Sequence, residues 1–410
     1  MVPLSDKTYM DWAATAPLCK EAAIAMEPFV QGGKDNIIYG GNANSLHSIG
    51  RDAFSAMEHA RETIARGIGA RPDELIFTSG ATEADNQALL GLTRAAIRAH
   101  TGRGEHDFKA HIITSSIEHD AVINTAKLLE DFGCEVTFIG PDSHGFIDPQ
   151  RIAQAMRPST VLVSVMLANN ELGSIQPIHE IAQIAHQGGA LCHTDAVQAL
   201  GKMIVDVNEL DVDAMSLSAH KICGPKGVGA LYVRHSDTCD PLIRGGGQES
   251  GARSGTQNVC GMVGFAAAFE ALCGDRDRLL KEAQRQRALR DQLYERLCSY
   301  DCVHMNVPCA PGSENYLPNI VDVHVDGFES ETMILRMDFS GVAISGGSAC
   351  ASHSLDPSRI LLAIGMQRDA ALCSLRFSIG RYTNQEDIDA CMKAFDTALH
   401  WDKRKEVLAR

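Results

Sequence analysis

Short apolar runs alternate with segments of helical periodicity between about residue 50 and residue 260. The first helical segment, which ends near Gly69, carries apolar side chains at the three- and four-residue spacing of one helix face. Several of the apolar runs are nearly continuous, as expected of strands that helices cover on both faces. The predicted strands are 74–78, 111–115, 135–139, 161–167, 190–193, 214–218 and 229–233. Because helical stretches separate several of them, the pattern predicts an α/β domain with a mainly parallel central sheet.

The pattern changes after Val259. A single long helical segment is predicted over 260–299, leading into a smaller α+β region. Thr383, with Glu386 three residues later, is predicted to form the capping box of the last helix. The sequence therefore predicts a large α/β domain over 15–260 and a small α+β domain made of 1–14 and 261–410.

Composition and charge exclude several classes of function. The 410 residues are 45% hydrophobic and 22% charged, which is typical of a soluble globular protein. The net charge of −15, without a basic face or long basic tail, argues against direct binding of nucleic acid. No N-terminal leader pattern and no apolar stretch of about 18 residues occur, so we expect no membrane segment and predict a cytoplasmic location.

The chain has 13 cysteines, an odd number, and no pair has the CxxC spacing. This usage indicates free thiols in a reducing compartment rather than a disulfide framework or a zinc site, and no metal is expected. Cys350 differs from the others because it follows Ser345-Gly346-Gly347-Ser348-Ala349, a loop-like segment rather than a core. We predict that Cys350 is the reactive cysteine.

Three polar segments lie at strand ends, where open α/β sheets bind ligands. Residues 78–83 join a strand to a helix, and the helix N-terminus with the Thr82 hydroxyl could bind an anion, although an ordinary helix cap fits this segment better when it is taken alone. Asp195 could hold a protonated ring nitrogen or could cap the turn that follows it. Lys221 could form a Schiff base if it is desolvated, although most lysines at strand ends are simply solvated.

In combination and in this order, these segments resemble the cysteine desulfurases, which are fold-type I enzymes dependent on pyridoxal 5'-phosphate. The resemblance extends from Tyr9 to Glu386, nearly the whole chain. The segments that carry it are 41–51, 76–86, 117–122, 168–178, 193–202, 216–234, 245–258, 345–352 and 374–383.

The resemblance implies a role for each matching residue. Lys221 would hold the cofactor as a Schiff base, Asp195 would pair with its ring nitrogen, and Gln198 would contact its ring hydroxyl. His119 would stack on the ring and assist proton transfer. The phosphate would be bound by Ala81, Thr82, Ser218, His220 and, in a homodimer, the partner subunit's Thr256. Asn170 and Arg376 would bind the substrate, with the Arg376 guanidinium on its α-carboxylate.

The implied activity is the conversion of L-cysteine to L-alanine, with the sulfur left as a persulfide on Cys350 of the small domain. The spacing after Cys350 resembles the class that supplies iron–sulfur scaffolds and tRNA-thiolation proteins. A selenocysteine lyase, or another pyridoxal-phosphate lyase or aminotransferase in which Cys350 is incidental, is the alternative enzyme. A non-catalytic scaffold is a further alternative, but it predicts loss of Lys221, Asp195 or Cys350, and all three are present.

Overall fold

The computed structural model describes residues 7–31, 40–347 and 356–401. Within these ranges the largest sheet has seven strands in the order β2-β8-β7-β6-β5-β3-β4. The strands are β2 (Leu75–Thr78), β3 (His111–Ser115), β4 (Glu135–Ile139), β5 (Thr160–Ser164), β6 (Leu191–Asp195), β7 (Ala214–Ser218) and β8 (Gly229–Val233). Strands β3 to β7 pair in parallel, whereas β8 is antiparallel to both β7 and β2. The predicted mainly parallel sheet is confirmed.

Helices cover both faces of this sheet because consecutive side chains of a strand point to opposite sides. In β3, Ile112 packs in a core with α3 (Ala81–Gly102) and α4 (Asp120–Asp131), while Ile113 belongs to the larger core on the other face. That larger core includes α2 (Ser48–Gly67), α6 (Ile178–Gln187) and α8 (Val259–Cys273), with α1 (Lys20–Val30) packed against α8. The shorter helices α5 (Pro149–Ala155) and α7 (Val207–Leu210) lie in loops between strands.

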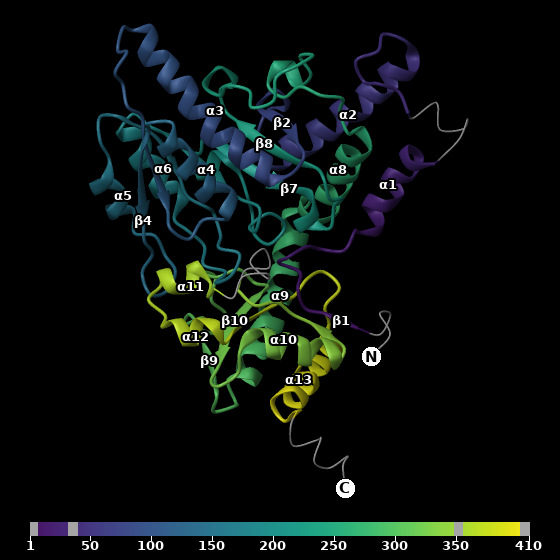
Figure 1. The fold of residues 1–410 in the computed structure, drawn as a ribbon. Helices are drawn as coiled ribbons and strands as arrows, with labels where there is room; N and C mark the ends of the chain where they lie inside the picture. Colours follow the sequence, from purple (N-terminus) through teal and green to yellow (C-terminus); the bar gives the residue numbers. More distant parts are fainter. Residues whose placement is uncertain (1–6, 32–39, 348–355, 402–410) are drawn as a thin grey trace.

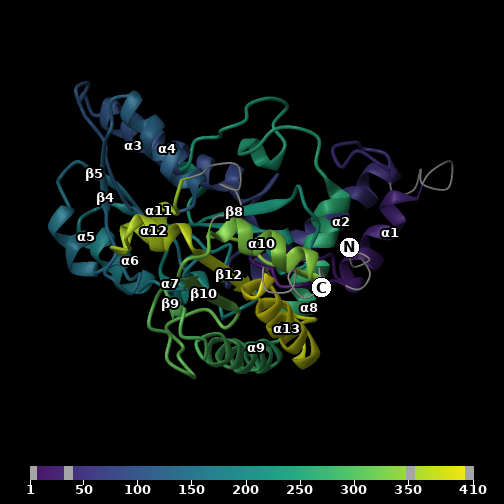
Figure 2. The ribbon, with the colours of Figure 1, turned by 60° about the horizontal axis from the view of Figure 1, so that its bottom comes forward.

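A smaller antiparallel sheet lies below the first in Figure 1. Its order is β12-β10-β9, formed by β9 (Val303–Met305), β10 (Ile320–Val325) and β12 (Ser374–Ser378). The helix α9 (Arg276–Leu297) packs against β10, as Figure 2 shows from below. The remaining helices of this part are α10 (Ser330–Phe339), α11 (Arg359–Ala363), α12 (Arg368–Leu372) and α13 (Gln385–Leu399). The predicted smaller α+β region is therefore present, while its exact boundaries stay a prediction.

The N-terminal segment connects the two sheets. Strand β1 (Thr8–Tyr9) pairs in parallel with β11 (Val342–Ala343), and Asp11 forms a bridge with Ser378 at the end of β12. A few residues later the Ala16 N–H donates to the His220 carbonyl, 2.9 Å away, next to β7. Segment 8–16 thus runs from one sheet to the other.

Two predictions in the C-terminal half are wrong. The helix predicted over 260–299 is two helices, because α8 ends at Cys273 with Gly274 as its C-cap. The Asp275 carboxylate then caps α9 by accepting from Arg278 N at 2.9 Å. The capping box of the last helix is formed by Asn384 and Asp387, not by Thr383 and Glu386. The Thr383 hydroxyl is used in the preceding turn, where it accepts from Gly380 N at 3.0 Å.

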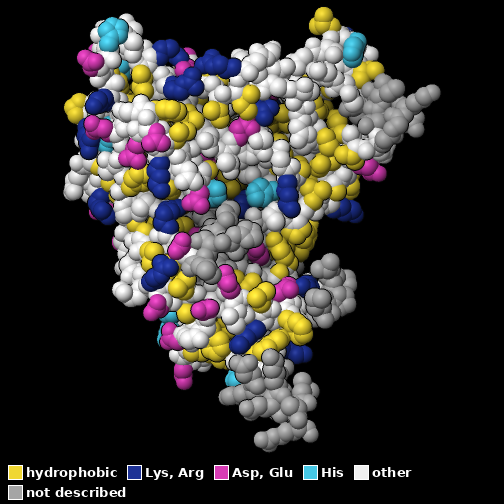
Figure 3. Space-filling view, in the orientation of Figure 1, with side chains coloured by type: hydrophobic (Ala, Val, Ile, Leu, Met, Phe, Trp, Pro, Cys, Tyr) yellow, Lys and Arg dark blue, Asp and Glu magenta, His cyan; other side chains and the backbone are white. Residues whose placement is uncertain are grey.

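The surface agrees with the mixed composition. The face in Figure 3 carries acidic and basic side chains interspersed with apolar ones. Among the helices in the described parts of the chain, none is long and apolar enough to cross a bilayer.

A buried ion pair fastens the segment before α8 to the edge of the large sheet. The Arg61 guanidinium, on α2, binds the Glu249 carboxylate through two hydrogen bonds of 2.7 Å, and Glu249 also accepts from Phe77 N at 2.9 Å. Both side chains are less than a tenth exposed. Glu249 thereby satisfies a backbone donor of the edge strand β2.

We predict that Arg61→Ala lowers the free energy of unfolding by about 3–5 kcal/mol, because it leaves the buried Glu249 carboxylate without its partner. Denaturant unfolding of the purified protein measures this change. The control is Arg276→Ala, which removes a solvent-exposed pair with Glu209 and should change stability by less than about 1 kcal/mol. Equal stability of the two variants would contradict the prediction.

Candidate active site

A cavity of about 560 Å³ opens at the carboxyl ends of β6 and β7, beside the N-terminus of α3. Arg376 from β12 and residues 13–15 of the N-terminal segment complete its wall. The cavity brings together ten of the site residues predicted from the sequence: His119, Ala81, Thr82, Asn170, Asp195, Gln198, Ser218, His220, Lys221 and Arg376.

Among the described residues, one predicted site residue is not part of this wall. Thr256 is exposed on the segment between Glu249–Gly251 and α8, and it does not line the cavity. Its predicted contribution to a partner's site remains a prediction. Cys350 lies outside the described residues.

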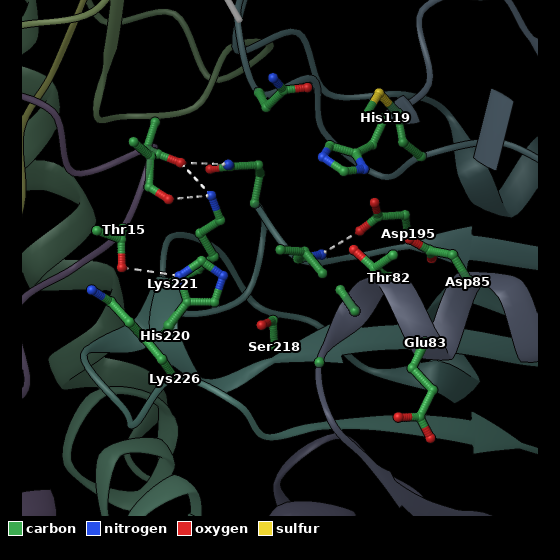
Figure 4. Close-up of a pocket in the computed structure, with 18 of the residues that line it drawn as sticks. Thr15, Thr82, Glu83, Asp85, His119, Asp195, Ser218, His220, Lys221 and Lys226 are labelled. Atoms are coloured by element: carbon green, nitrogen blue, oxygen red, sulfur yellow. Dashed lines mark hydrogen bonds between the residues drawn. The ribbon is translucent and has the colours of Figure 1, made fainter. Parts of the chain in front are cut away.

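The Lys221 amine lies against the N-terminal segment. Lys221 follows β7 in a short 3-10 turn, and its Nζ donates to the carbonyl oxygens of Ala13 at 2.5 Å and Ala14 at 2.8 Å. The Gln198 amide donates to the same Ala13 oxygen at 3.0 Å, and His220 Nδ1 lies 3.1 Å from the Thr15 hydroxyl (Figure 4). The backbone of residues 13 and 14 therefore sets the direction of the amine. This contact was not predicted, because it is made by backbone carbonyls and the alanine side chains give no indication of it.

Asp195 ends strand β6 on the opposite side of the cavity from Thr15 and His220 in Figure 4. Its carboxylate is 6% exposed and accepts from Val197 N at 2.9 Å. The carboxylate therefore caps the following turn, which was one of the two roles predicted for Asp195. It also lines the cavity. Burial raises the pKa of Asp195, while the hydrogen bond from Val197 and the charges of His119 and Lys221 oppose this shift. A cationic donor in the cavity would stabilise the ionised carboxylate.

The N-terminus of α3 offers a binding site for an anion. Gly80, at the helix cap, has a φ of 153° and no side-chain capping bond, so no cap side chain occupies the first-turn N–H groups. Thr82, Ser218, His220 and Lys226 line the same cavity. Burial, with the charges of Lys221 and Lys226, lowers the pKa of His220 to about 4, so its imidazole is neutral at pH 7. Hydrogen-bond donors together with a lysine charge are suited to binding a phosphate group.

Arg376 is positioned to bind a carboxylate. It is 1% exposed, and its guanidinium donates to the Asn170 carbonyl at 2.9 Å and to the Asp11 carboxylate at 3.1 Å. Its Nε and the Asn170 Oδ1 are buried without a hydrogen-bond partner in the structure. Both residues line the cavity, so a ligand there can satisfy a donor that is otherwise costly to bury.

His119 stands at the start of α4 and has a structural contact as well as a place in the cavity. Its Nδ1 accepts from Ala121 N at 3.1 Å, which caps the helix and assigns the ring proton to Nε2 when the imidazole is neutral. The cap also holds the ring in a fixed place at the cavity wall.

A buried carboxyl group of the cavity wall, that of Asp85, was not predicted from the sequence. Asp85, on α3, is 1% exposed, and neither of its oxygens has a hydrogen-bond partner in the structure. Burial and the charge of Asp195 raise the pKa of Asp85 well above its ordinary value. One signal was available, because Asp85 precedes Leu89 by one helical turn and therefore lies on the buried side of α3.

A second missed acid is Glu118, next to His119. It is fully buried, accepts from Met166 N at 2.9 Å and from the Ser115 hydroxyl, and burial raises its pKa to about 8. Below Asp195 on β6, the His193 imidazole lies between the hydroxyls of Ser164 at 2.9 Å and Ser216 at 3.0 Å. These groups form a buried polar layer beneath the cavity.

Twelve cysteines fall within the described residues, and all are free thiols. Burial raises the pKa of Cys239, Cys273 and Cys391 to about 12, so these thiols stay protonated and unreactive at neutral pH.

Comparison with known proteins identifies the family. The aminotransferase class-V family model matches residues 8–391, nearly the whole length of the chain. The chain belongs to this family. Cysteine desulfurase IscS of Dictyoglomus turgidum is 43% identical over 387 residues, which are 93% of this chain and 92% of the relative. Cysteine desulfurase IscS of Methanosarcina thermophila is 41% identical over 94% of this chain and 90% of the relative.

Solved structures of this family share the fold. A NifS-like protein superposes with a TM-score of 0.85 at 34% identity, covering 96% of this chain and all of the other. SspA in complex with cysteine superposes with a TM-score of 0.77, also at 34% identity, over 92% of this chain and all of SspA. The predicted fold class, that of the cysteine desulfurases, is confirmed.

The buried layer predicts a pH dependence of stability. Burial lowers the pKa of His193 to about 3 from 6.5. As pH falls below about 6.5, the unfolded chain gains a proton that the folded chain does not take up until about pH 3, so stability is lost across this window. We expect His193 to account for a loss on the order of 2 kcal/mol between pH 7 and pH 5.

The test is denaturant unfolding of wild type and His193→Asn at both pH values. The variant should lack this part of the pH dependence, whatever its stability at pH 7. An exposed control, His106→Asn, should keep the wild-type dependence. If His193→Asn loses as much stability as wild type between the two pH values, the assignment of a neutral buried His193 is wrong.

Proposed function

We propose that this chain is a cysteine desulfurase, which converts L-cysteine to L-alanine and leaves the sulfur as a persulfide on Cys350. The observation that carries the proposal is the convergence of Lys221, Asp195 and Arg376 on one cavity. An amine from the turn after β7, a buried acid at the end of β6 and a buried guanidinium from β12 of the other sheet face one space. The relatives named cysteine desulfurase, about 40% identical over more than nine-tenths of the chain, support the same activity.

The cavity fits pyridoxal 5'-phosphate as the cofactor. Its phosphate would be held by the N-terminus of α3 at Ala81 and Thr82, by Ser218 and His220, and in a homodimer by the partner subunit's Thr256. Asp195, which is buried, would bind the protonated ring nitrogen, and Gln198 would contact the ring hydroxyl. When bound, this cofactor stabilises the negative charge that develops on the substrate when its Cα proton leaves.

Lys221 and His119 have the proton-transfer roles in this proposal. Lys221 would hold the cofactor covalently, and its free Nζ would remove the Cα proton. The carbonyl oxygens of residues 13 and 14 stabilise the protonated ammonium form that results. His119 would lie on the face of the ring, where its capping bond to α4 fixes the imidazole, and would assist proton transfer.

Arg376 and Asn170 would orient L-cysteine by its α-carboxylate. The unpartnered Nε of Arg376 gains a charge-assisted hydrogen bond when the carboxylate binds. This bond favours the orientation of L-cysteine in which its α-carboxylate faces Arg376. Asp11 accepts a hydrogen bond from Arg376 Nη2 and helps to fix the orientation of the guanidinium.

The sulfur transfer requires the Cys350 thiolate. A sulfur–sulfur bond forms between Cys350 and the substrate while the substrate's Cβ–S bond breaks, and Cβ takes a proton to give alanine. No outside oxidant is needed, because the two electrons of the broken bond remain on the alanine carbon. We propose that an iron–sulfur scaffold or a tRNA-thiolation protein then accepts the sulfur in the cytoplasm.

Incubation of the purified holoenzyme with L-cysteine tests the activity. We expect one alanine per sulfur transferred and a persulfide on Cys350 that reductant releases as sulfide. Cys350→Ser should keep the visible absorbance of the bound cofactor and should yield neither persulfide nor reductant-released sulfide. Sulfide release by Cys350→Ser at the wild-type rate would contradict the proposal and would favour a lyase in which Cys350 is incidental.

A second experiment tests Arg376. Arg376→Gln removes a charge-assisted hydrogen bond of about 1.5–3 kcal/mol, so the KM for L-cysteine should rise about 10-fold to 100-fold. Steady-state kinetics across cysteine concentrations measure this rise. Arg376→Lys should recover part of the affinity, because it restores the charge but not the planar fork.

The matched control for this experiment is Arg381→Gln. Arg381 is near the same strand but forms a partly exposed pair with Glu21 outside the cavity, so its loss should leave the KM unchanged. Equal KM values for Arg376→Gln and wild type would show that Arg376 does not bind the substrate.

A further inference from the structure

A group of metal-binding side chains lies at the edge of the small sheet, on β9 and β10. His304 and His324 are directly opposite each other in the antiparallel pairing of these strands. Asp326 follows β10. The strand order makes β9 an edge strand, so this group is reached from solvent and is separate from the cavity described above.

The three side chains approach one another closely. His304 Nε2 lies 2.9 Å from the Asp326 carboxylate, and His324 Nε2 lies 3.9 Å from the other oxygen of that carboxylate. One ligand atom from each residue lies within 4.8 Å of the other two. A tetrahedral ion with bonds of about 2.0–2.1 Å separates its ligand atoms by about 3.4 Å, so small side-chain rotations close the site. Exposure of the His304 and Asp326 side chains, 48% and 63%, leaves room for these rotations.

A second contact orients His324 for metal binding. Its Nδ1 lies 2.8 Å from the Asn306 side-chain oxygen, which only accepts, so Nδ1 carries the proton and Nε2 presents its lone pair beside Asp326. The Asn306 amide is fixed in that orientation because its nitrogen donates to Asp322 at 3.0 Å and to Ser374 at 3.2 Å. Histidines that bind metals are usually held by such a hydrogen bond from the other ring nitrogen.

We propose that His304, His324 and Asp326 bind a divalent transition-metal ion of the zinc class. Two imidazole nitrogens with one carboxylate suit Zn²⁺ better than Mg²⁺ or Ca²⁺, which prefer oxygen ligands only. Three protein ligands leave the fourth position of a tetrahedral ion to water or to a group from another molecule. The site is independent of the proposed cofactor and substrate.

Asn306 is the positioning residue of this site and also lies on the polar face that extends to Arg376. Asp322, its hydrogen-bond partner, is directly opposite Arg376 in the pairing of β10 and β12. The alternate positions of these strands, Val321, Val323, Leu375 and Phe377, are buried in the core on the other face. The Asn306 amide is thus held from the protein interior, not by solvent.

The experiment is equilibrium dialysis of the holoenzyme against Zn²⁺, with the zinc content per chain and the thermal unfolding midpoint as readouts. Wild type should retain one zinc more per chain than His304→Ala or Asp326→Asn, and zinc should raise its unfolding midpoint more. Zinc bound by the 13 cysteines is common to wild type and variants, so it cancels when their zinc contents are compared. Asn306→Ala should weaken zinc binding about 10-fold to 100-fold by releasing the His324 ring.

His235→Ala is the control, because His235 is exposed on a different part of the surface. It should bind zinc as wild type does. Because His304 and Asp326 are exposed, their variants should keep the fold, which circular dichroism and cofactor absorbance check. Equal zinc content and equal midpoint shifts in wild type, His304→Ala and Asp326→Asn would overturn the proposal.

Discussion

The active site depends on the contact between the Lys221 amine and the backbone carbonyls of residues 13 and 14. The chain makes this contact by passing segment 8–16 between the two sheets, from the pairing of β1 with β11 to the turn after β7. Along this path Asp11 binds Arg376, residues 13 and 14 bind Lys221, and Thr15 contacts His220. Nine consecutive residues of the chain therefore hold a side chain of β12 and the turn after β7, from two different sheets, around one cavity.

The second constraint is the burial of charge around that cavity. Asp195 and Asp85 both have a raised pKa because water is excluded from their surroundings, and burial raises the pKa of Glu118 to about 8. Folding alone gives no reason to collect such groups, because each ionised acid in the interior lowers stability unless it gains a partner. A ligand with a positive ring nitrogen supplies that partner at Asp195. Relief of the unfavourable burial of Asp195 would contribute to binding of the proposed cofactor.

The central elements could be predicted from the sequence because strand and helix periodicities differ. The parallel strands were recognised from their apolar runs, and polar residues at their ends then fell on one edge of the sheet by geometry. The break between α8 and α9 was missed because Gly274 and Asp275 interrupt a segment whose composition is helical on both sides. At the last helix, Thr383 and Asn384 are both suitable N-cap residues. The Thr383 hydroxyl instead accepts from Gly380 N in the preceding turn, and Asn384 caps the helix.

Predicting the site required more than local pattern. Asp195 and Lys221 each had an ordinary structural explanation when considered alone, and the family resemblance chose between the explanations. Arg376 was identified through that resemblance only. The role of the carbonyls of residues 13 and 14 could not be predicted, because every residue has a backbone carbonyl and its partner depends on the fold. Asp85 was overlooked because an aspartate on a helix is usually solvated, and only its place on the apolar stripe indicates burial.

The most direct test of the account is to identify the lysine that carries the cofactor. Holoenzyme reduced with borohydride fixes the cofactor to its lysine, and peptide mapping by mass spectrometry then locates it. In the described parts of the chain two lysines line the cavity, Lys221 and Lys226, and the Lys221 amine donates to the N-terminal segment. We expect the label on Lys221 alone. A label on Lys226, or a purified protein that takes up no pyridoxal phosphate, would contradict it.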